Sequence, residues 1–124
     1  MKIIFFVIFE TFDDSSRHAV TLTRGANVTD HAVYYAFIGK FCIITFRFET
    51  SSTINAGNQI FKYMNVPRWI ENGFVACVKM IGTDKMFNVY FDTYNSETGG
   101  NCLLAAENIS TTGSFRGSIA YITY

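Results

Sequence analysis

Hydrophobic and polar residues alternate with a period of two along most of the chain, whereas the period of a helix is almost absent. Between Cys42 and Phe48 every second residue is apolar, while Thr45 and Arg47 take the other face. The same alternation recurs over residues 74–81, 87–92 and 119–122. Because successive side chains of a strand point to opposite faces, this pattern predicts strands that each pack one face on a core.

Clusters of turn-forming residues separate these stretches. Gly39-Lys40 is predicted to connect two strands directly, and Gly82-Thr83-Asp84-Lys85 is the clearest hairpin signal. Asn72-Gly73 suits a tight turn because both residues tolerate positive φ angles. About eight strands are predicted, with a ninth closing the chain, over residues 2–9, 19–23, 32–38, 41–49, 60–64, 73–81, 86–93, 102–106 and 118–123. Short strands at this spacing predict an all-β, antiparallel β-sandwich in one domain that spans residues 1–124.

The start of the chain is strongly apolar from Ile3 to Phe9, after the cation Lys2. A short apolar run behind a positive charge is typical of a signal peptide, but Glu10 ends this run early and no small-x-small cleavage site follows at once. The run is also too short for membrane insertion as a spanning helix, which takes about 20 apolar residues. We predict that it forms a buried strand, because its residues are those that strands prefer.

The composition narrows the class of protein. Only 16% of the 124 residues are charged, and 17% are aromatic. Low charge with high hydrophobicity excludes a disordered chain, and the residues that dominate a coiled coil are not enriched. Ten basic and ten acidic residues cancel, so nothing favours nonspecific binding to nucleic acid. A net charge of zero promotes association, so we predict that other copies of the chain cover part of the surface.

The three cysteines, Cys42, Cys77 and Cys102, are far apart in the sequence and form no CxxC motif. Each lies in an apolar run, so we expect buried side chains that act as small hydrophobic residues. One disulfide with a spare thiol is the alternative.

Two histidines lie near carboxylates. His18 follows Asp13 and Asp14, and His31 follows Asp30. Zinc takes three or four converging ligands and calcium takes several oxygens, and no spacing of such a site is matched here. We predict solvated loop charges, with no metal and no cofactor.

The residue patterns typical of active sites are also weak in this sequence. The carboxylates that could pair for glycoside hydrolysis are Asp84, Asp92, Glu97 and Glu107. Some pairs among ten acidic residues are expected by chance. Ser114 and Ser118 lack the spacing of a nucleophile elbow. We therefore predict that the protein is not an enzyme.

The order of the segments is more specific than any single motif. Gly39-Lys40 leads into the strand over 41–49, and a Ser/Thr-rich stretch over 50–54 follows. The strand Gln59-Ile60-Phe61 then steps to Asn65-Val66-Pro67, a strand pair surrounds Gly82, and residues 115–124 close the chain. This order resembles the C-terminal head domains of bacteriophage tail fibres and receptor-binding proteins, over residues 28–124. The chain departs from that pattern at Arg68-Trp69-Ile70, where the family often has an Arg-Pro pair, and at the apolar residues 1–9.

The resemblance implies a jelly-roll β-sandwich that forms a homotrimer at the tip of a phage tail in the virion, after assembly in the cytoplasm of the bacterial host. Unpaired cysteines agree with cytoplasmic assembly. Such a head is a non-catalytic adhesin that binds a saccharide or a protein on the bacterial surface. The alternatives are a structural virion component, which binds other virion proteins and docks its N-terminal strand by strand addition, and a small carbohydrate-active enzyme.

Two groups of residues are candidates for ligand binding. Trp69 could form an aromatic platform for a sugar ring, with hydrogen bonds from Arg68, although Trp more commonly anchors the core of such folds. The loop over residues 92–100 combines hydrogen-bonding groups, an aromatic ring and two glycines. Its candidate ligand-binding residues are Asp92, Tyr94, Asn95 and Glu97. Tyr34 and Tyr35 are adjacent, so a strand would direct one to the core and the other outward.

Overall fold

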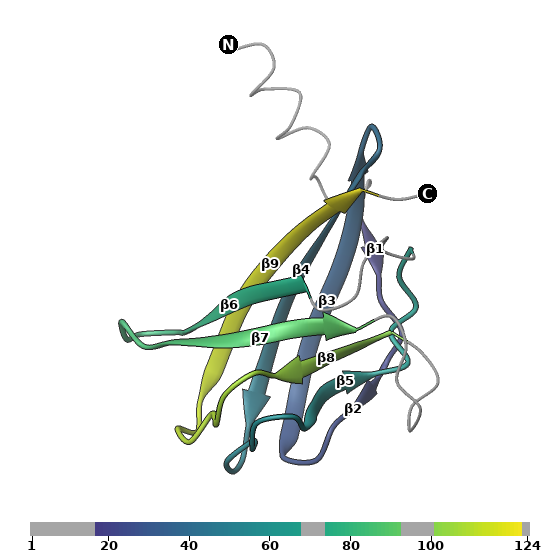
Figure 1. Ribbon diagram of the computed structural model, residues 1–124. Helices are drawn as coiled ribbons and strands as arrows, with labels where there is room; N and C mark the ends of the chain where they lie inside the picture. The colour runs from purple at the N-terminus through teal and green to yellow at the C-terminus, as the bar shows by residue number, and fades with distance from the viewer. Residues whose placement is uncertain (1–16, 68–73, 93–100, 123–124) are drawn as a thin grey trace.

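The computed structural model describes residues 17–67, 74–92 and 101–122 (Figure 1). Their nine strands are β1 (His18–Ala19), β2 (Thr23–Arg24), β3 (Val28–Ile38), β4 (Phe41–Thr50), β5 (Gln59–Lys62), β6 (Phe74–Met80), β7 (Met86–Asp92), β8 (Cys102–Ala105) and β9 (Ser114–Ile122). All pairs are antiparallel, in the order β1-β3-β4-β9-β6-β7-β8-β5-β2. The all-β, antiparallel prediction is confirmed.

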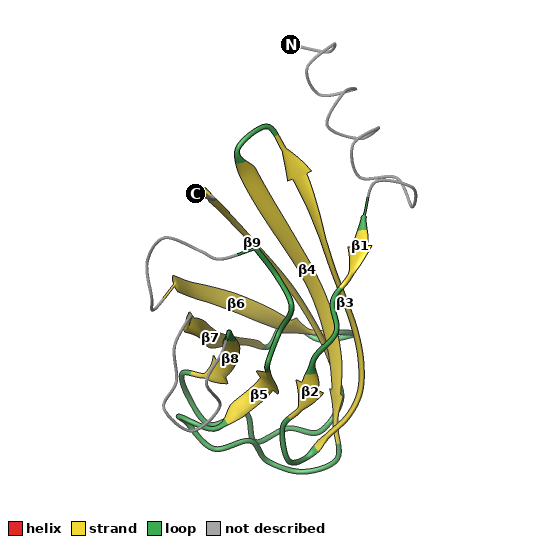
Figure 2. Ribbon diagram, turned by 90° about the vertical axis from the view of Figure 1, so that its right-hand side faces the viewer, coloured by secondary structure: helices red, strands yellow, loops and turns green. Residues whose placement is uncertain are grey.

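The nine strands form one continuous sheet that curls into a half-barrel, and this is not clearly a sandwich or a jelly roll. Strands β6, β7, β8 and β5 cross the direction of β3, β4 and β9, as Figures 1 and 2 show from two sides. The curl brings β5 back toward β3, although five strands separate them in the sheet. The His31 ring of β3 lies edge-on to the Phe61 ring of β5, with centroids 5.9 Å apart.

The inside of the curl holds the hydrophobic core. On β4, Cys42, Ile44, Phe46 and Phe48 are all buried, so the alternation predicted for this strand is confirmed. The core is rich in phenylalanine, and the Phe48 ring stacks on Phe115 of β9 with centroids 5.1 Å apart. Burial of this apolar surface is the main force that holds the curled sheet together.

Both predicted hairpins between well-paired strands are confirmed. Ile38 pairs with Phe41, so Gly39 and Lys40 form a two-residue loop in which Gly39 has a φ of 58°. Glycine adopts this left-handed conformation without the strain that a Cβ atom causes. The second hairpin joins β6 to β7, and the Met80 N–H donates to the Lys85 carbonyl across its base. The turn predicted at Asn72-Gly73 lies outside the described residues.

The largest errors in the predicted strand boundaries concern three strands. The strand expected over 19–23 is two short strands, because the chain pairs first with β3 and then crosses to β5 at the other edge of the sheet. Strand β3 begins at Val28 rather than at residue 32, and β9 begins at Ser114 rather than at 118. The first residues of both strands are mostly polar or glycine and did not indicate a strand, yet both segments pair with the C-terminal end of β4. The strand predicted over residues 2–9 lies outside the described residues.

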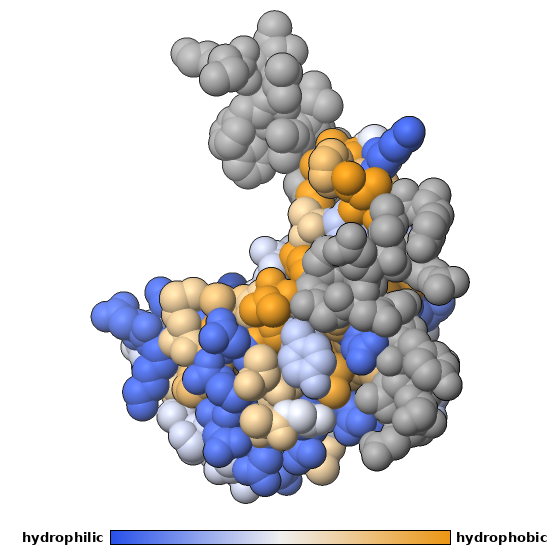
Figure 3. Space-filling view, viewed as in Figure 1, coloured by the Kyte–Doolittle hydropathy of each residue, from blue (hydrophilic) through white to orange (hydrophobic). Residues whose placement is uncertain are grey.

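The far ends of β3, β4 and β9 project beyond the crossing strands as an apolar arm, which we define by Phe37, Phe41 and Ile122 (Figure 1). These side chains are 41%, 50% and 48% exposed. Phe41 and Ile122 are directly opposite each other on β4 and β9. Hydrophobic residues gather at this end of the molecule in Figure 3. The Phe41 and Ile122 side chains form an exposed apolar pair on the outer face of the arm, whereas Phe37 lies opposite the inward-facing Cys42, on the inner face.

The three cysteines are free thiols. Cys42 and Cys102 are buried, as predicted, and burial raises the pKa of the Cys42 thiol. The prediction for Cys77 was wrong, because it lies on the outward face of β6, between the inward-facing Ala76 and Val78. Its thiol lies 3.3 Å from the side-chain oxygen of Asn88 on β7, to which it donates. No helix in the described segments is long and apolar enough to cross a membrane.

Candidate functional site

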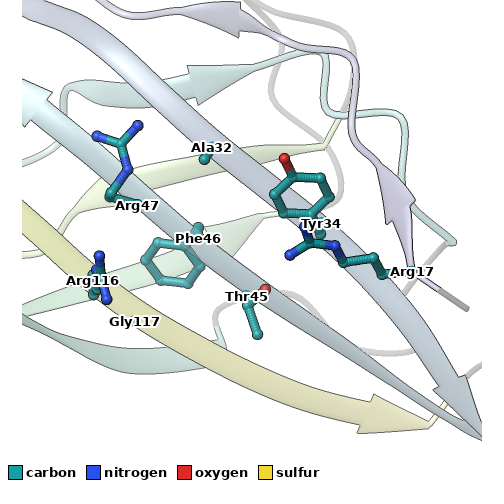
Figure 4. Close-up of a pocket in the computed structure, with 8 residues that line it drawn as sticks. All are labelled: Arg17, Ala32, Tyr34, Thr45, Phe46, Arg47, Arg116 and Gly117. Carbon is teal, nitrogen blue, oxygen red and sulfur yellow. The ribbon is translucent and has the colours of Figure 1, made fainter. Parts of the chain in front are cut away.

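A pocket of about 290 Å³ opens on the outer face of the sheet, over β3, β4 and β9 (Figure 4). Its lining residues are Arg17, Ala32, Tyr34, Thr45, Phe46, Arg47, Arg116 and Gly117. A second hollow of about 250 Å³ shares Arg17, Tyr34 and Thr45 with it. Three arginines and a tyrosine therefore surround one continuous depression, which we call the arginine pocket.

The pairing register brings these residues together. Tyr34 of β3 lies opposite Thr45 of β4, and Arg47 of β4 lies opposite Arg116 of β9. Directly opposite residues of an antiparallel pair point to the same face of the sheet. The core takes the inward residues of β4, so Thr45 and Arg47 must face outward. Long, continuously paired strands hold the pocket in place, unlike a site made of loops.

Arg17 and Tyr34 form one end of the pocket. The Arg17 guanidinium lies 4.1 Å from the centre of the Tyr34 ring, within the range of a cation–π interaction. Tyr35 faces the other way, packs against the core and stacks on His18 with ring centroids 4.9 Å apart. The prediction that the two adjacent tyrosines take opposite faces is confirmed.

Arg47 is held by two carboxylates. One of its terminal nitrogens donates to Asp30 over 3.0 Å, and the other lies 3.4 Å from a Glu49 oxygen. The hydrogen bond from Arg47 is the main reason why the pKa of Asp30 lies below its ordinary value. The carboxylates fix the orientation of the Arg47 guanidinium and offset its charge.

His31 precedes the pocket residue Ala32 in β3, but it lies on the opposite face of the sheet, inside the curl. Its Nδ1 accepts a hydrogen bond of 2.9 Å from the Arg24 side chain, which also donates to the Thr29 carbonyl. Partial burial lowers the pKa of His31, and the charge of Arg24 lowers it further. The folded protein therefore favours the neutral imidazole, which alone can accept this hydrogen bond.

We expect His31 to make the folded state less stable in mild acid. The unfolded chain binds a proton at His31 near pH 6.5, whereas the folded chain binds it at lower pH. Between these two pKa values the unfolded state binds more protons than the folded state. The free energy of unfolding therefore falls as the pH drops below about 6.5. Urea unfolding at several pH values should show this fall in the wild type and in His18→Gln. A His31→Gln variant that loses as much stability in the same range would contradict the assignment.

Most of the ligand-binding residues predicted from the sequence fall outside the described segments: Arg68, Trp69, Tyr94, Asn95 and Glu97. Asp92 is described, at the end of β7, where it pairs with Cys102 of β8. It does not line the arginine pocket. Sequence analysis singled out Tyr34 and the outward direction of Arg47, but missed Arg17 and Arg116. Only the register between β4 and β9 shows that Arg47 and Arg116 are neighbours.

The carboxylates considered for glycoside hydrolysis do not converge where they are described. Asp84 lies in the β6–β7 turn and Asp92 at the other end of β7. A Glu107 oxygen accepts a hydrogen bond of 2.9 Å from the Asn88 N–H, so it extends the ladder after β8 ends. The described segments also hold no group of three or more His, Cys, Asp or Glu side chains that could bind a metal ion.

No protein-family model matches the chain, and no match is found among the curated proteins. A function for this chain must therefore be inferred from its described residues and from the order of segments in its sequence.

Proposed function

We propose that the protein is the receptor-binding head of a bacteriophage tail, a non-catalytic adhesin that binds a saccharide or a protein on the bacterial surface. The order of segments in the sequence supports this function, and so does the all-β scaffold. We further propose that the protein forms a homotrimer and that it is assembled in the host cytoplasm and then located in the tail of the virion. As the resemblance implies, its sheet would be related to the jelly roll.

The observation that carries the proposal is the arginine pocket itself. Its side chains can donate hydrogen bonds and offer an aromatic face, which is what recognition of a polar surface ligand requires. Arg47 and Tyr34 already hold fixed orientations through Asp30, Glu49 and Arg17. Binding therefore orders few side chains, and this preorganisation favours affinity.

The direct test is adsorption of the purified, fluorescently labelled protein to a panel of bacterial strains, measured by flow cytometry. At least one strain is expected to bind the protein, and unlabelled protein should compete for the same sites. The protein should also slow infection of that strain by a phage whose tail carries it. Failure to adsorb to any strain that such a phage infects would contradict the adhesin function.

The apolar arm supports the proposed trimer. Low overall charge and the exposed apolar side chains of the arm both favour contact with another copy of the chain. Three copies would also present three pockets at once, which raises the avidity for a repeated surface ligand without any new contact.

We expect the combined substitutions Phe41→Ser and Ile122→Ser to dissociate the trimer, because both remove exposed apolar surface from the arm. Light scattering coupled to size exclusion should give the wild type a mass near three times 14.0 kDa and give the double variant a mass near 14.0 kDa. The control is Val75→Ser, which removes a 68% exposed side chain from the outward face of β6. A monomeric wild type, or dissociation by the control alone, would contradict the arm as the contact.

One observation favours the structural virion component as a second candidate function. Among the described residues, β6 pairs with β9 only at residues 115–117, so residues 118–122 have no neighbouring strand along this edge of β9. Such an edge can accept a strand from another virion protein. Deleting residues 1–9 separates the candidates. Loss of incorporation into the virion with intact binding to cells favours the structural role, whereas the reverse favours the adhesin.

A further inference from the structure

Three cations face the same side of the sheet on three neighbouring strands. Arg116 of β9 lies directly opposite Arg47 of β4 on one side and directly opposite Lys79 of β6 on the other. Like charges at directly opposite positions destabilise a sheet. Asp30 and Glu49 offset the charge of Arg47 alone, so Arg116 remains between two cations, and an anion bound beside it would offset the remaining repulsion.

No carboxylate in the described part of the chain offsets the positive charge of Arg116. Asp30 of β3 and Glu49 of β4 both contact Arg47. Within the described part of the chain, Arg116 makes no ion pair and no side-chain hydrogen bond. Its planar guanidinium, exposed at the pocket, can form two parallel hydrogen bonds with a carboxylate or a phosphate.

The rest of the pocket suits a sugar ring that carries such a group. Figure 4 shows Arg47 and Arg116 at one end of the pocket, and Tyr34 with Arg17 at the other. Thr45, between these two ends, brings a hydroxyl group that both donates and accepts. A hydroxylated ring beside Tyr34 would thus find hydrogen-bonding groups while its anionic substituent reaches Arg116.

We propose that the arginine pocket binds a bacterial surface saccharide through an anionic substituent, a carboxylate or a phosphate, held by Arg116 and Arg47. Tyr34 and Thr45 contact the sugar ring. The proposal rests on the adhesin function and specifies the chemical class of its ligand.

The test is isothermal titration calorimetry of the full chain with three probes. These are an oligosaccharide of galacturonic acid, a neutral galactose oligosaccharide of the same length, and an oligomer of glycerol phosphate. One or both anionic probes are expected to bind and the neutral probe is not. Binding of only one anionic probe identifies the source of the anion. Affinity should fall as the ionic strength rises, because exposed charges are screened.

Arg116→Gln is expected to weaken binding of the anionic probe by about tenfold to a hundredfold, the range for a hydrogen bond between charged groups. Lys85→Gln is the control, since it removes an exposed cation in the β6–β7 turn that does not line the pocket. Arg116→Gln should keep the thermal midpoint or raise it, because it relieves repulsion. A fall in the midpoint would assign Arg116 to the fold and overturn the proposal.

The outcomes separate this proposal from the function on which it rests. If the protein adsorbs to cells but neither anionic probe binds, or Arg116→Gln binds them as the wild type does, the ligand class is wrong and the adhesin function stands. If an anionic probe binds through Arg116 but the protein adsorbs to no strain, the pocket is correct and the adhesin function fails. Equal affinity for the neutral probe also overturns the proposal.

Discussion

Replacing Phe48 with alanine is expected to lower the free energy of unfolding by about 3–5 kcal/mol, the usual range for losing a fully buried phenylalanine side chain. The Phe48 ring is fully buried, stacks on Phe115 at 5.1 Å and meets Phe61 edge-on at 5.9 Å. It thus links β4 to β9 on one side and to β5 on the other. Alanine would leave a cavity at the point where the curl of the sheet brings distant strands together.

Equilibrium unfolding in urea, followed by circular dichroism, measures the change. The control is Val75→Ala on β6, because Val75 is 68% exposed and its truncation opens no cavity. The control should change the stability by less than about 0.5 kcal/mol. A loss below about 1 kcal/mol for Phe48→Ala would mean that the rings do not pack as the structure has them.

The strands could be predicted where one face is buried and the other is not. Residues 42–48 show this, because the core takes Ile44, Phe46 and Phe48 while Thr45 and Arg47 remain outside. The first residues of β3 gave no such signal. Thr29, Asp30 and His31 are polar, and they belong to the strand because β4 supplies hydrogen-bond partners alongside them. Local sequence does not contain that information.

The curl of the sheet could not be predicted for a related reason. Alternation gives each strand an inside and an outside, but it does not give the order of strands in the sheet. A sandwich and a half-barrel thus require much the same pattern from each strand. The difference depends on which strands pair, such as β9 between β4 and β6.

The arginine pocket was missed for the same reason. Arg47 and Arg116 are 69 positions apart, and only the β4–β9 register makes them neighbours. Each alone is an ordinary outward-facing cation of a strand. Together they place two cations directly opposite each other, which destabilises the sheet. Locally unfavourable groups of this kind, on an otherwise rigid sheet, are typical of binding sites.

Gly25→Ala is expected to have an effect comparable to that of Phe48→Ala, through a different mechanism. A Cβ atom at position 25 would lie 1.8 Å from the Gln59 backbone oxygen and 2.8 Å from its carbonyl carbon. The Gly25 N–H donates to the Ile60 carbonyl over 2.9 Å, so the two segments cannot separate without losing that hydrogen bond. Over-packing typically costs about 1–3 kcal/mol, and because backbone atoms must move here, we expect a cost at or above the upper end of this range.

The displacement should be local to the edge of the sheet. Among the described strands, β2 pairs with β5 alone, through Thr23 with Lys62 and Arg24 with Phe61. Pushing β2 away from β5 would open this edge and let water reach the core beside Phe61. Hydrogen exchange at the amide of position 25 should therefore accelerate in Gly25→Ala, beyond what the lower global stability alone produces.

Gly39→Asn is the matched control, because Gly39 has a φ of 58° and no atom within 4 Å of the position of an added Cβ. Asparagine tolerates this left-handed conformation, so the control should lose about 1 kcal/mol or less. Gly25 does not have a positive φ, so its substitution tests only the close approach of its Cα to the Gln59 backbone. If Gly25→Ala had the same free energy of unfolding and the same exchange rate as the wild type, β2 would not lie against β5. The half-barrel would then end at β5.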